Sequence, residues 1–87
     1  MVISARKKFR KNFKKVPAKI RLAFAQRVDI FRANPLHPLL NNHALDGKYF
    51  GFRSINITGD WRAIFREDGN YKFVTFETIG THSQLYK

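Results

Sequence analysis

Residues 55–80 read INITGDWRAIFREDGNYKFVTFETIG, and two turn signals divide this stretch into three runs rich in aromatic and β-branched residues. Thr58-Gly59 separates the first run from the second, and Asp68-Gly69 separates the second from the third. An Asp-Gly pair between alternating apolar residues is among the strongest short hairpin signals. We therefore predict a three-strand antiparallel meander. Its strands are expected at Tyr49–Ile57, Trp61–Arg66 and Tyr71–Ile79.

The apolar spacing in the first of these strands is irregular. Phe50, Phe52, Ile55 and Ile57 follow one another at two steps of two residues with a step of three between them. Because side chains alternate between the two faces of a strand, the longer step predicts a β-bulge between Phe52 and Ile55.

Upstream of the meander, the pattern is helical. Apolar residues recur at steps of three and four, which is the stripe of an amphipathic helix: Phe9, Phe13, Val16, Ile20, Phe24, Val28 and Phe31. Pro17 interrupts the stripe, and proline is tolerated in the first turn of a helix but not inside it. We predict helices at Ala5–Lys15 and Pro17–Ala33, a short strand before them at Val2–Ser4, and a loop from Pro35 to Gly47.

Together these elements predict an α+β fold in a single domain that spans residues 1–87. The basic helical hairpin is expected to pack on one face of a small antiparallel sheet, which consists of the N-terminal strand and the meander. The opposite face is expected to stay open and to carry Arg53 and Arg62. Nine Phe, three Tyr and one Trp supply the large side chains that such a small core needs.

The charge of the chain is strongly positive and uneven. Seventeen Lys and Arg residues oppose six Asp and Glu residues, and no acidic residue occurs from Met1 to Val28. Such a field acts on partners rather than on the fold. The expected partner is a polyanion or an acidic protein.

Several classes of site are excluded by the composition. The carboxylates are scattered singly, the three histidines have no cysteine beside them, and no glycine-rich loop precedes a helix. We expect no metal and no cofactor. The lack of cysteine fits a reducing compartment, and neither a spanning segment nor a secretory signal is visible. We therefore expect a cytoplasmic protein without membrane association.

Imidazole and abundant Arg and Lys remain, and this combination suits metal-free cleavage of RNA through its own 2′-hydroxyl. Histidine transfers protons near neutral pH, and the arginine fork stabilises charge on phosphorus. Basic charge by itself equally favours a non-catalytic RNA- or DNA-binding module.

Four segments in order resemble a known family: residues 43–47 (HALDG), 51–53 (GFR), 59–65 (GDWRAIF) and 79–86 (IGTHSQLY). They resemble the RelE-like toxins of bacterial type II toxin–antitoxin modules, and most of all the YafQ-type mRNA interferases. The resemblance covers essentially the whole chain. It implies a RelE-like fold and a metal-independent endoribonuclease that cuts mRNA in the A site of the 70S ribosome. It also implies a cognate acidic antitoxin.

The resemblance also implies roles for individual residues. His82 matches the general acid or base of the YafQ branch, and His43 and Asp60 match two further residues that this branch needs. Arg62 matches an arginine that contacts the scissile phosphate, and Tyr86 matches a C-terminal aromatic residue that assists proton transfer. Two positions depart from the branch: Asn56 stands in place of a histidine, and Ser54 in place of an acidic residue.

RNA contacts are expected from residues near this site and from the basic hairpin. They are Lys48, Arg53 and Asn56, with Lys7, Lys8, Lys11, Lys14 and Lys15. Two alternatives to the mRNA interferase stay open. One is a ParE-like toxin that inhibits DNA gyrase without cutting RNA, and the other is a non-catalytic RNA-binding module.

Overall fold

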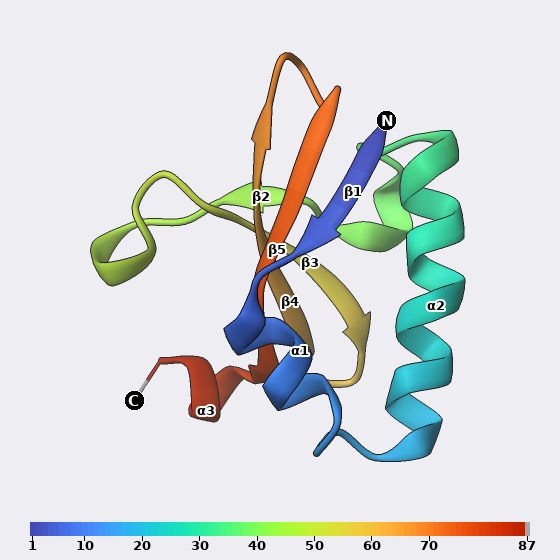
Figure 1. The fold of residues 1–87 in the computed structure, drawn as a ribbon, viewed down its shortest axis with the longest axis vertical. Coiled ribbons are helices and arrows are strands. Elements are labelled where there is room, and N and C mark those ends of the chain that lie inside the picture. Colours follow the sequence, from blue (N-terminus) through green and yellow to red (C-terminus); the bar gives the residue numbers. More distant parts are fainter. Residues whose placement is uncertain (87) are drawn as a thin grey trace.

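The computed structural model describes residues 1–86 as an α+β domain in which helices cover a five-stranded sheet (Figure 1). The strands are β1 (Val2–Ala5), β2 (His43–Ala44), β3 (Arg53–Thr58), β4 (Trp61–Asp68) and β5 (Phe73–Thr81). The helices are α1 (Lys7–Phe13), α2 (Ala18–Ala33) and α3 (His82–Leu85), and two short 3₁₀ turns are η1 (Pro38–Leu40) and η2 (Gly47–Tyr49). Within the described residues, no helix is long and apolar enough to cross a membrane.

The predicted meander is confirmed, with shifted strand ends. β3, β4 and β5 are antiparallel neighbours. The turn after Asp68 is longer than a two-residue turn, because Gly69, Asn70 and Tyr71 all have positive φ angles. Consequently β5 begins at Phe73 rather than at Tyr71, and it continues to Thr81.

The prediction of a purely antiparallel sheet is wrong. The strand order is β1-β5-β4-β3-β2, and β1 pairs with β5 in parallel. A fifth strand, β2, lies inside the segment predicted as a loop and pairs His43 with Ser54. Two residues are too few to produce an alternating pattern, so this edge strand left no signal in the sequence.

The predicted bulge is displaced as well. Phe52 lies before β3, next to Gly51 with φ +92°, so the step of three from Phe52 to Ile55 spans a turn and the start of a strand. The register of β3 shifts instead between Asn56 and Thr58. A second shift makes Glu77 an extra residue on β5, opposite Ile64 and Phe65.

Both predicted helices are present. α1 begins at Lys7 and ends at Phe13, and Pro17 precedes the first turn of α2 as expected. The side chain of Arg27 on α2 donates from Nε to the carbonyl oxygen of Ile57 at 2.8 Å. This bond fastens α2 to β3, which lies toward the edge of the sheet opposite β1.

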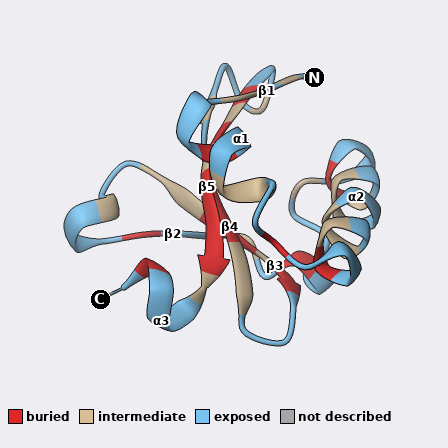
Figure 2. Cartoon of the chain, turned by 60° about the horizontal axis from the view of Figure 1, so that its bottom comes forward, coloured by how far each residue is buried: buried red, intermediate tan, exposed pale blue. Residues whose placement is uncertain are grey.

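A cluster of aromatic rings holds the helices on the sheet. Phe76 on β5 lies 5.5 Å from Phe9 of α1 and 5.2 Å from Phe24 of α2, measured between ring centroids. It also lies 6.2 Å from Phe31 and 5.7 Å from Phe65. The buried residues therefore gather on the central strands β4 and β5 (Figure 2).

The opposite face of the sheet is not left open throughout, contrary to expectation. Ile64 on β4 faces that side and is fully buried beneath Leu45 and Leu85. Tyr49 and Phe52 pack around this second, smaller cluster. Leu85 belongs to α3, so the C-terminal end of the described chain is anchored on the sheet by apolar contact.

We predict that Phe76→Ala costs about 3–5 kcal/mol of unfolding free energy, because it removes a fully buried ring shared by both helices and β4. Phe50→Ala, whose ring is 80% exposed, is the matched control and is expected to cost well under 1 kcal/mol. Urea denaturation followed by circular dichroism measures both values. Equal costs for the two variants would contradict the role given to Phe76.

Candidate functional site

His82 lies where β5 ends and α3 begins, and its backbone is held at several points. Its N–H donates to the carbonyl oxygen of Asp60 at 3.0 Å, and its own carbonyl accepts from the N–H of Tyr86. Thr81 and Gln84 form a capping box: the Thr81 hydroxyl accepts from the Gln84 N–H, and the Gln84 side chain accepts from the Thr81 N–H at 2.9 Å. The imidazole is exposed on a rigid backbone.

Gly80 lets α3 fold back onto the sheet. A Cβ at this position would lie 3.1 Å from Gln84 Oε1 and 3.3 Å from Leu85 Cδ2. A side chain at this position would therefore press on the Gln84 and Leu85 side chains, which lie against the sheet at close range.

The Tyr86 ring lies against both His82 and Tyr49. The ring centroids of His82 and Tyr86 are 4.7 Å apart, and those of Tyr49 and Tyr86 are 5.7 Å apart in an edge-to-face arrangement. Burial raises the pKa of the Tyr86 phenol, and the nearby positive charge of Arg62 offsets part of this rise. The phenol consequently keeps its proton at neutral pH and can act as a hydrogen-bond donor.

Arg62 brings a positive charge to the same place. It is in register with Gly80 on one side and with Asn56 on the other. Its Nη1 donates to the carbonyl oxygens of Gly59 at 2.9 Å and of Trp61 at 3.0 Å. These bonds hold the guanidinium near the β3–β4 turn, within electrostatic reach of Tyr86.

Asp60 contributes to the arrangement through its backbone. Its carbonyl oxygen accepts from His82, and the residue is exposed at the β3–β4 turn. The structure therefore brings together four of the five residues predicted as catalytic: His82, Asp60, Arg62 and Tyr86.

His43 lies apart from these four. It is exposed on the edge strand β2, and its Nδ1 lies 2.9 Å from the carbonyl oxygen of Asn41. His43 pairs with Ser54 on β3, and Ser54 pairs in turn with Ile64 on β4. Leu85 packs on Ile64. No hydrogen bond or ring contact joins the side chains of His43 and His82 in the described part of the chain.

Two polar atoms on this face of β3 are buried without a hydrogen-bond partner among the described residues: Ser54 Oγ and Asn56 Oδ1. Both residues occupy positions where the resemblance expects groups that exchange protons or carry charge. Neither hydroxyl nor amide can replace an imidazole in proton transfer near neutral pH.

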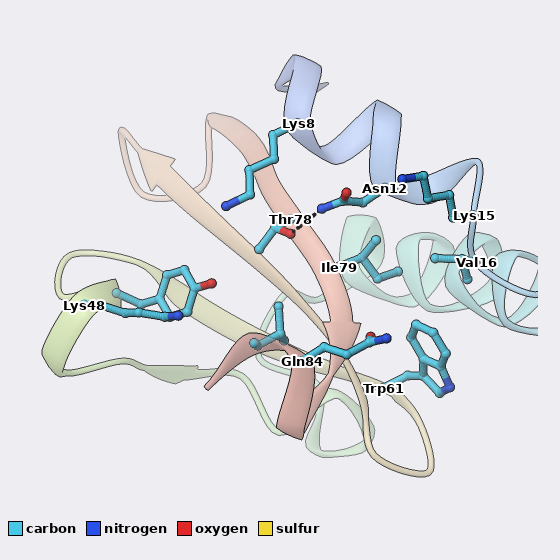
Figure 3. A pocket seen from close by; sticks show the side chains of 11 residues that line it. Lys8, Asn12, Lys15, Val16, Lys48, Trp61, Thr78, Ile79 and Gln84 are labelled. Atoms are coloured by element: carbon cyan, nitrogen blue, oxygen red, sulfur yellow. Dashed lines mark hydrogen bonds between the residues drawn. The ribbon is translucent and has the colours of Figure 1, made fainter. Parts of the chain in front are cut away.

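The residues predicted to bind RNA fall into different settings. Lys8, Lys15 and Lys48 line a pocket between α1 and α3 (Figure 3). Arg53 is only partly available, because its Nε donates to Asn42 Oδ1 at 2.8 Å. Lys7, Lys11 and Lys14 are exposed on or just after α1.

Sequence reasoning missed Tyr49, which packs against Tyr86 and also lines the pocket between α1 and α3. Tyr49 ends the turn η2 and does not begin a strand, contrary to the prediction of a strand at Tyr49–Ile57. Its contact with Tyr86 joins residues far apart in the chain, and one sequence carries no signal for such a pair. The sequence predictions also omitted the α3 turn, although Thr81 followed three residues later by Gln84 is the pattern of a capping box.

No group of three His, Cys, Asp or Glu side chains that could hold a metal ion is found among residues 1–86. The groups available for chemistry in this part of the chain are an imidazole, a protonated phenol and a guanidinium.

Comparison with known proteins identifies the family. No curated protein sequence matches the chain, but solved structures do. YafQ in the Escherichia coli DinJ–YafQ complex is 25% identical, with a TM-score of 0.71 over 98% of this chain and 97% of the other. The archaeal RelE–RelB complex from Pyrococcus horikoshii OT3 gives 17% identity and a TM-score of 0.74, with coverages of 95% and 96%.

A YoeB/ParE toxin from Agrobacterium tumefaciens is similar in fold at 16% identity, with a TM-score of 0.76 and coverages of 94% and 99%. The predicted RelE-like α+β fold is therefore confirmed. The family described as bacterial toxin of type II toxin–antitoxin system, YafQ, matches residues 1–87. The chain thus belongs to the YafQ family of toxins from bacterial type II toxin–antitoxin systems.

Proposed function

We propose that this toxin is an endoribonuclease that cleaves mRNA in the A site of the ribosome and thereby blocks translation. The observation that carries the proposal is the tilted contact of the His82 imidazole with the Tyr86 phenol ring, 4.7 Å apart between centroids, beside Arg62. A proton-transferring group, a proton donor and a cation thus lie together on a chain of formal charge +11. RNA is a polyanion that carries its own nucleophile, the 2′-hydroxyl, which such groups can activate.

The proposed reaction needs no metal. A base removes the proton of the 2′-hydroxyl, and the 2′-oxygen attacks the adjacent phosphorus. The bond from phosphorus to the 5′-oxygen then breaks, and an acid returns a proton to that leaving oxygen. The products are a 2′,3′-cyclic phosphate and a 5′-hydroxyl, so atoms and charge balance.

His82 is proposed as one of the two proton-transfer groups, and Arg62 as the cation that stabilises the charge that builds on the phosphoryl oxygens. Tyr86 would orient the imidazole by its ring contact and donate its phenolic proton toward the phosphate or the leaving oxygen. Asp60 positions His82 through its carbonyl, and we propose that its carboxylate faces the substrate. His43, on β2, would act on a substrate that crosses the sheet face.

An acidic antitoxin is the proposed protein partner. The YafQ of Escherichia coli forms a complex with DinJ, and the archaeal RelE forms one with RelB. The first 28 residues here contain no acidic side chain, so an acidic protein would neutralise a surface that otherwise favours RNA. We place the toxin in the cytoplasm, where both the ribosome and such an antitoxin are available.

One alternative has an observation in its favour. The fold is similar to that of a toxin described as YoeB/ParE, so the scaffold is compatible with ParE-like inhibition of DNA gyrase. That activity needs no imidazole on the sheet face. Unchanged supercoiling by gyrase in the presence of the toxin would set this alternative aside.

We predict that His82→Gln lowers ribosome-dependent mRNA cleavage at least ~100-fold, because general acid–base catalysis typically contributes ~10²–10⁴-fold. Glutamine keeps a polar side chain at the start of α3 but transfers no proton. Primer extension on mRNA in a purified translation system measures the cuts.

His37→Gln is the matched control for this variant. His37 Nδ1 accepts from the Leu39 N–H at 3.1 Å in the η1 turn, away from the site, so its cleavage is expected to equal that of wild type. Cleavage by the His82 variant at the wild-type rate would falsify the catalytic role. If the wild-type protein blocks translation without cutting mRNA, the non-catalytic RNA-binding module would be the remaining hypothesis.

We also predict that Tyr86→Phe lowers kcat about 10–100-fold with little change in KM. The ring contacts with His82 and Tyr49 remain in this variant, and only the phenolic donor is lost. Tyr71→Phe is the control, since the Tyr71 hydroxyl accepts from Asn42 in a structural contact. Single-turnover cleavage rates on programmed ribosomes distinguish the two, and a kcat unchanged by Tyr86→Phe would limit Tyr86 to ring packing.

A further inference from the structure

A pocket of about 370 Å³ lies between α1 and α3, next to the site described above. Lys8 approaches it from α1, Lys15 from the turn that follows α1, and Lys48 from η2 on the other side, as Figure 3 shows. The space is within the ~300–1,000 Å³ range of small-molecule sites. We call it the α1–α3 pocket.

The walls of the α1–α3 pocket are fixed by hydrogen bonds. Asn12 Nδ2 on α1 donates to Thr78 Oγ1 on β5 at 3.1 Å, which fastens one wall to the sheet. Gln84 and Leu85 form another wall, and the capping box with Thr81 holds that turn. The pocket is therefore formed before any ligand arrives, which lowers the entropic cost of binding.

The charge inside the pocket is positive and unbalanced. Its lining includes the three lysines and no acidic side chain. Among residues 1–86, no carboxylate lies within ion-pairing distance of these lysines. Glu77 is close enough to contribute to the raised pKa of Tyr49, but its carboxylate is paired with Arg6 at 3.5 Å.

Aromatic rings connect the pocket with the proposed catalytic residues. Tyr49 lines the pocket and packs against Tyr86 at 5.7 Å between ring centroids, while the Tyr86 ring contacts His82 at a tilt. Trp61, the neighbour of Arg62 in sequence, lines the pocket as well. A chain of alternating phosphates and flat bases could therefore pass from His82 across Tyr49 into the pocket without leaving the surface.

We propose that the α1–α3 pocket is a phosphodiester-binding subsite, in which Lys8, Lys15 and Lys48 hold a phosphate of an RNA strand that flanks the cleavage site. This inference rests on the proposed function for the identity of that strand. The phosphate belongs either to the mRNA or to ribosomal RNA, since both offer the same group. Lysine is a point charge that suits a phosphate approached from several sides.

An acidic peptide is the competing occupant, and the residues that line the pocket favour RNA over it. Three lysines around one pocket suit a phosphate, and the Trp61 ring that lines the same pocket is the kind of side chain on which a base stacks. Lys48 Nζ already lies over the Tyr49 ring, 5.2 Å from its centroid. A carboxylate-bearing peptide would use the charge but not the Trp61 ring.

The test removes the three charges together in Lys8→Gln/Lys15→Gln/Lys48→Gln. The matched control is Arg32→Gln/Arg66→Gln/Lys72→Gln, which loses the same charge at exposed positions outside the pocket. Binding of a short single-stranded RNA, made uncleavable by a 2′-deoxy nucleotide, is followed by fluorescence anisotropy over a salt series. Sedimentation with ribosomes is measured in parallel.

The pocket variant is expected to lose about 0.7 from the slope of log K against log salt, the value of one phosphate contact on a single strand. The control is expected to keep the wild-type slope. A single neutral methylphosphonate linkage is then moved along the RNA. At one position this linkage should weaken RNA binding by the wild-type protein but not RNA binding by the pocket variant. Such a position would show that the pocket holds a phosphate of the mRNA strand.

Loss of ribosome binding without loss of RNA binding also supports a phosphate subsite and assigns it to ribosomal RNA. Pocket and control variants that bind both ligands alike would overturn the inference. Loss of antitoxin binding alone would overturn it in favour of an acidic peptide. Because the RNA is uncleavable, these outcomes stand even if wild type proves unable to cut mRNA, so the two proposals fail separately.

Discussion

The packing of aromatic rings around Phe76 is the constraint on which the other features of this structure depend. Phe76 is 1% exposed and contacts rings from α1, α2 and β4. A chain of 87 residues has little surface to bury, so its helices are positioned by a few large side chains. The same packing places α1 beside β5, where it forms one wall of the α1–α3 pocket. Stability and the shape of the candidate binding surface thus share one set of contacts.

The C-terminal turn α3 is held on the sheet by apolar contact and hydrogen bonds. Termini usually fray, but here Leu85 is buried on Ile64, Gly80 permits close approach, and the capping box holds the first turn of α3. The exposed imidazole of His82 therefore stands on an anchored backbone. His82 and Tyr86 face outward because Leu85 faces inward, and α3 is too short to offer any other arrangement.

Arginine and lysine side chains lie in different settings in the described residues. Arg6 pairs with Glu77, Arg27 donates to Ile57, and Arg53 donates to Asn42, so these side chains fasten the fold. The lysines of α1 and η2 remain exposed. For the residues named here, this division follows the chemistry of the two residue types. The planar fork of arginine satisfies backbone and amide oxygens, whereas the flexible and strongly hydrated lysine is suited to surface contacts with phosphate.

The sequence by itself determined the elements whose signals are local. The Asp-Gly turn, the helical stripe interrupted by Pro17, and the spacing of four between His82 and Tyr86 all act over a few residues, and the last pair meets on one helical turn. Only the tertiary structure decided the parallel pairing of β1 with β5 and the edge strand at His43. The same holds for the packing of Leu45 and Leu85 on the second face of the sheet and for the contact of Tyr49 with Tyr86. These depend on pairings between distant segments, which are selected by the packing of the whole core and leave no periodic trace in one chain.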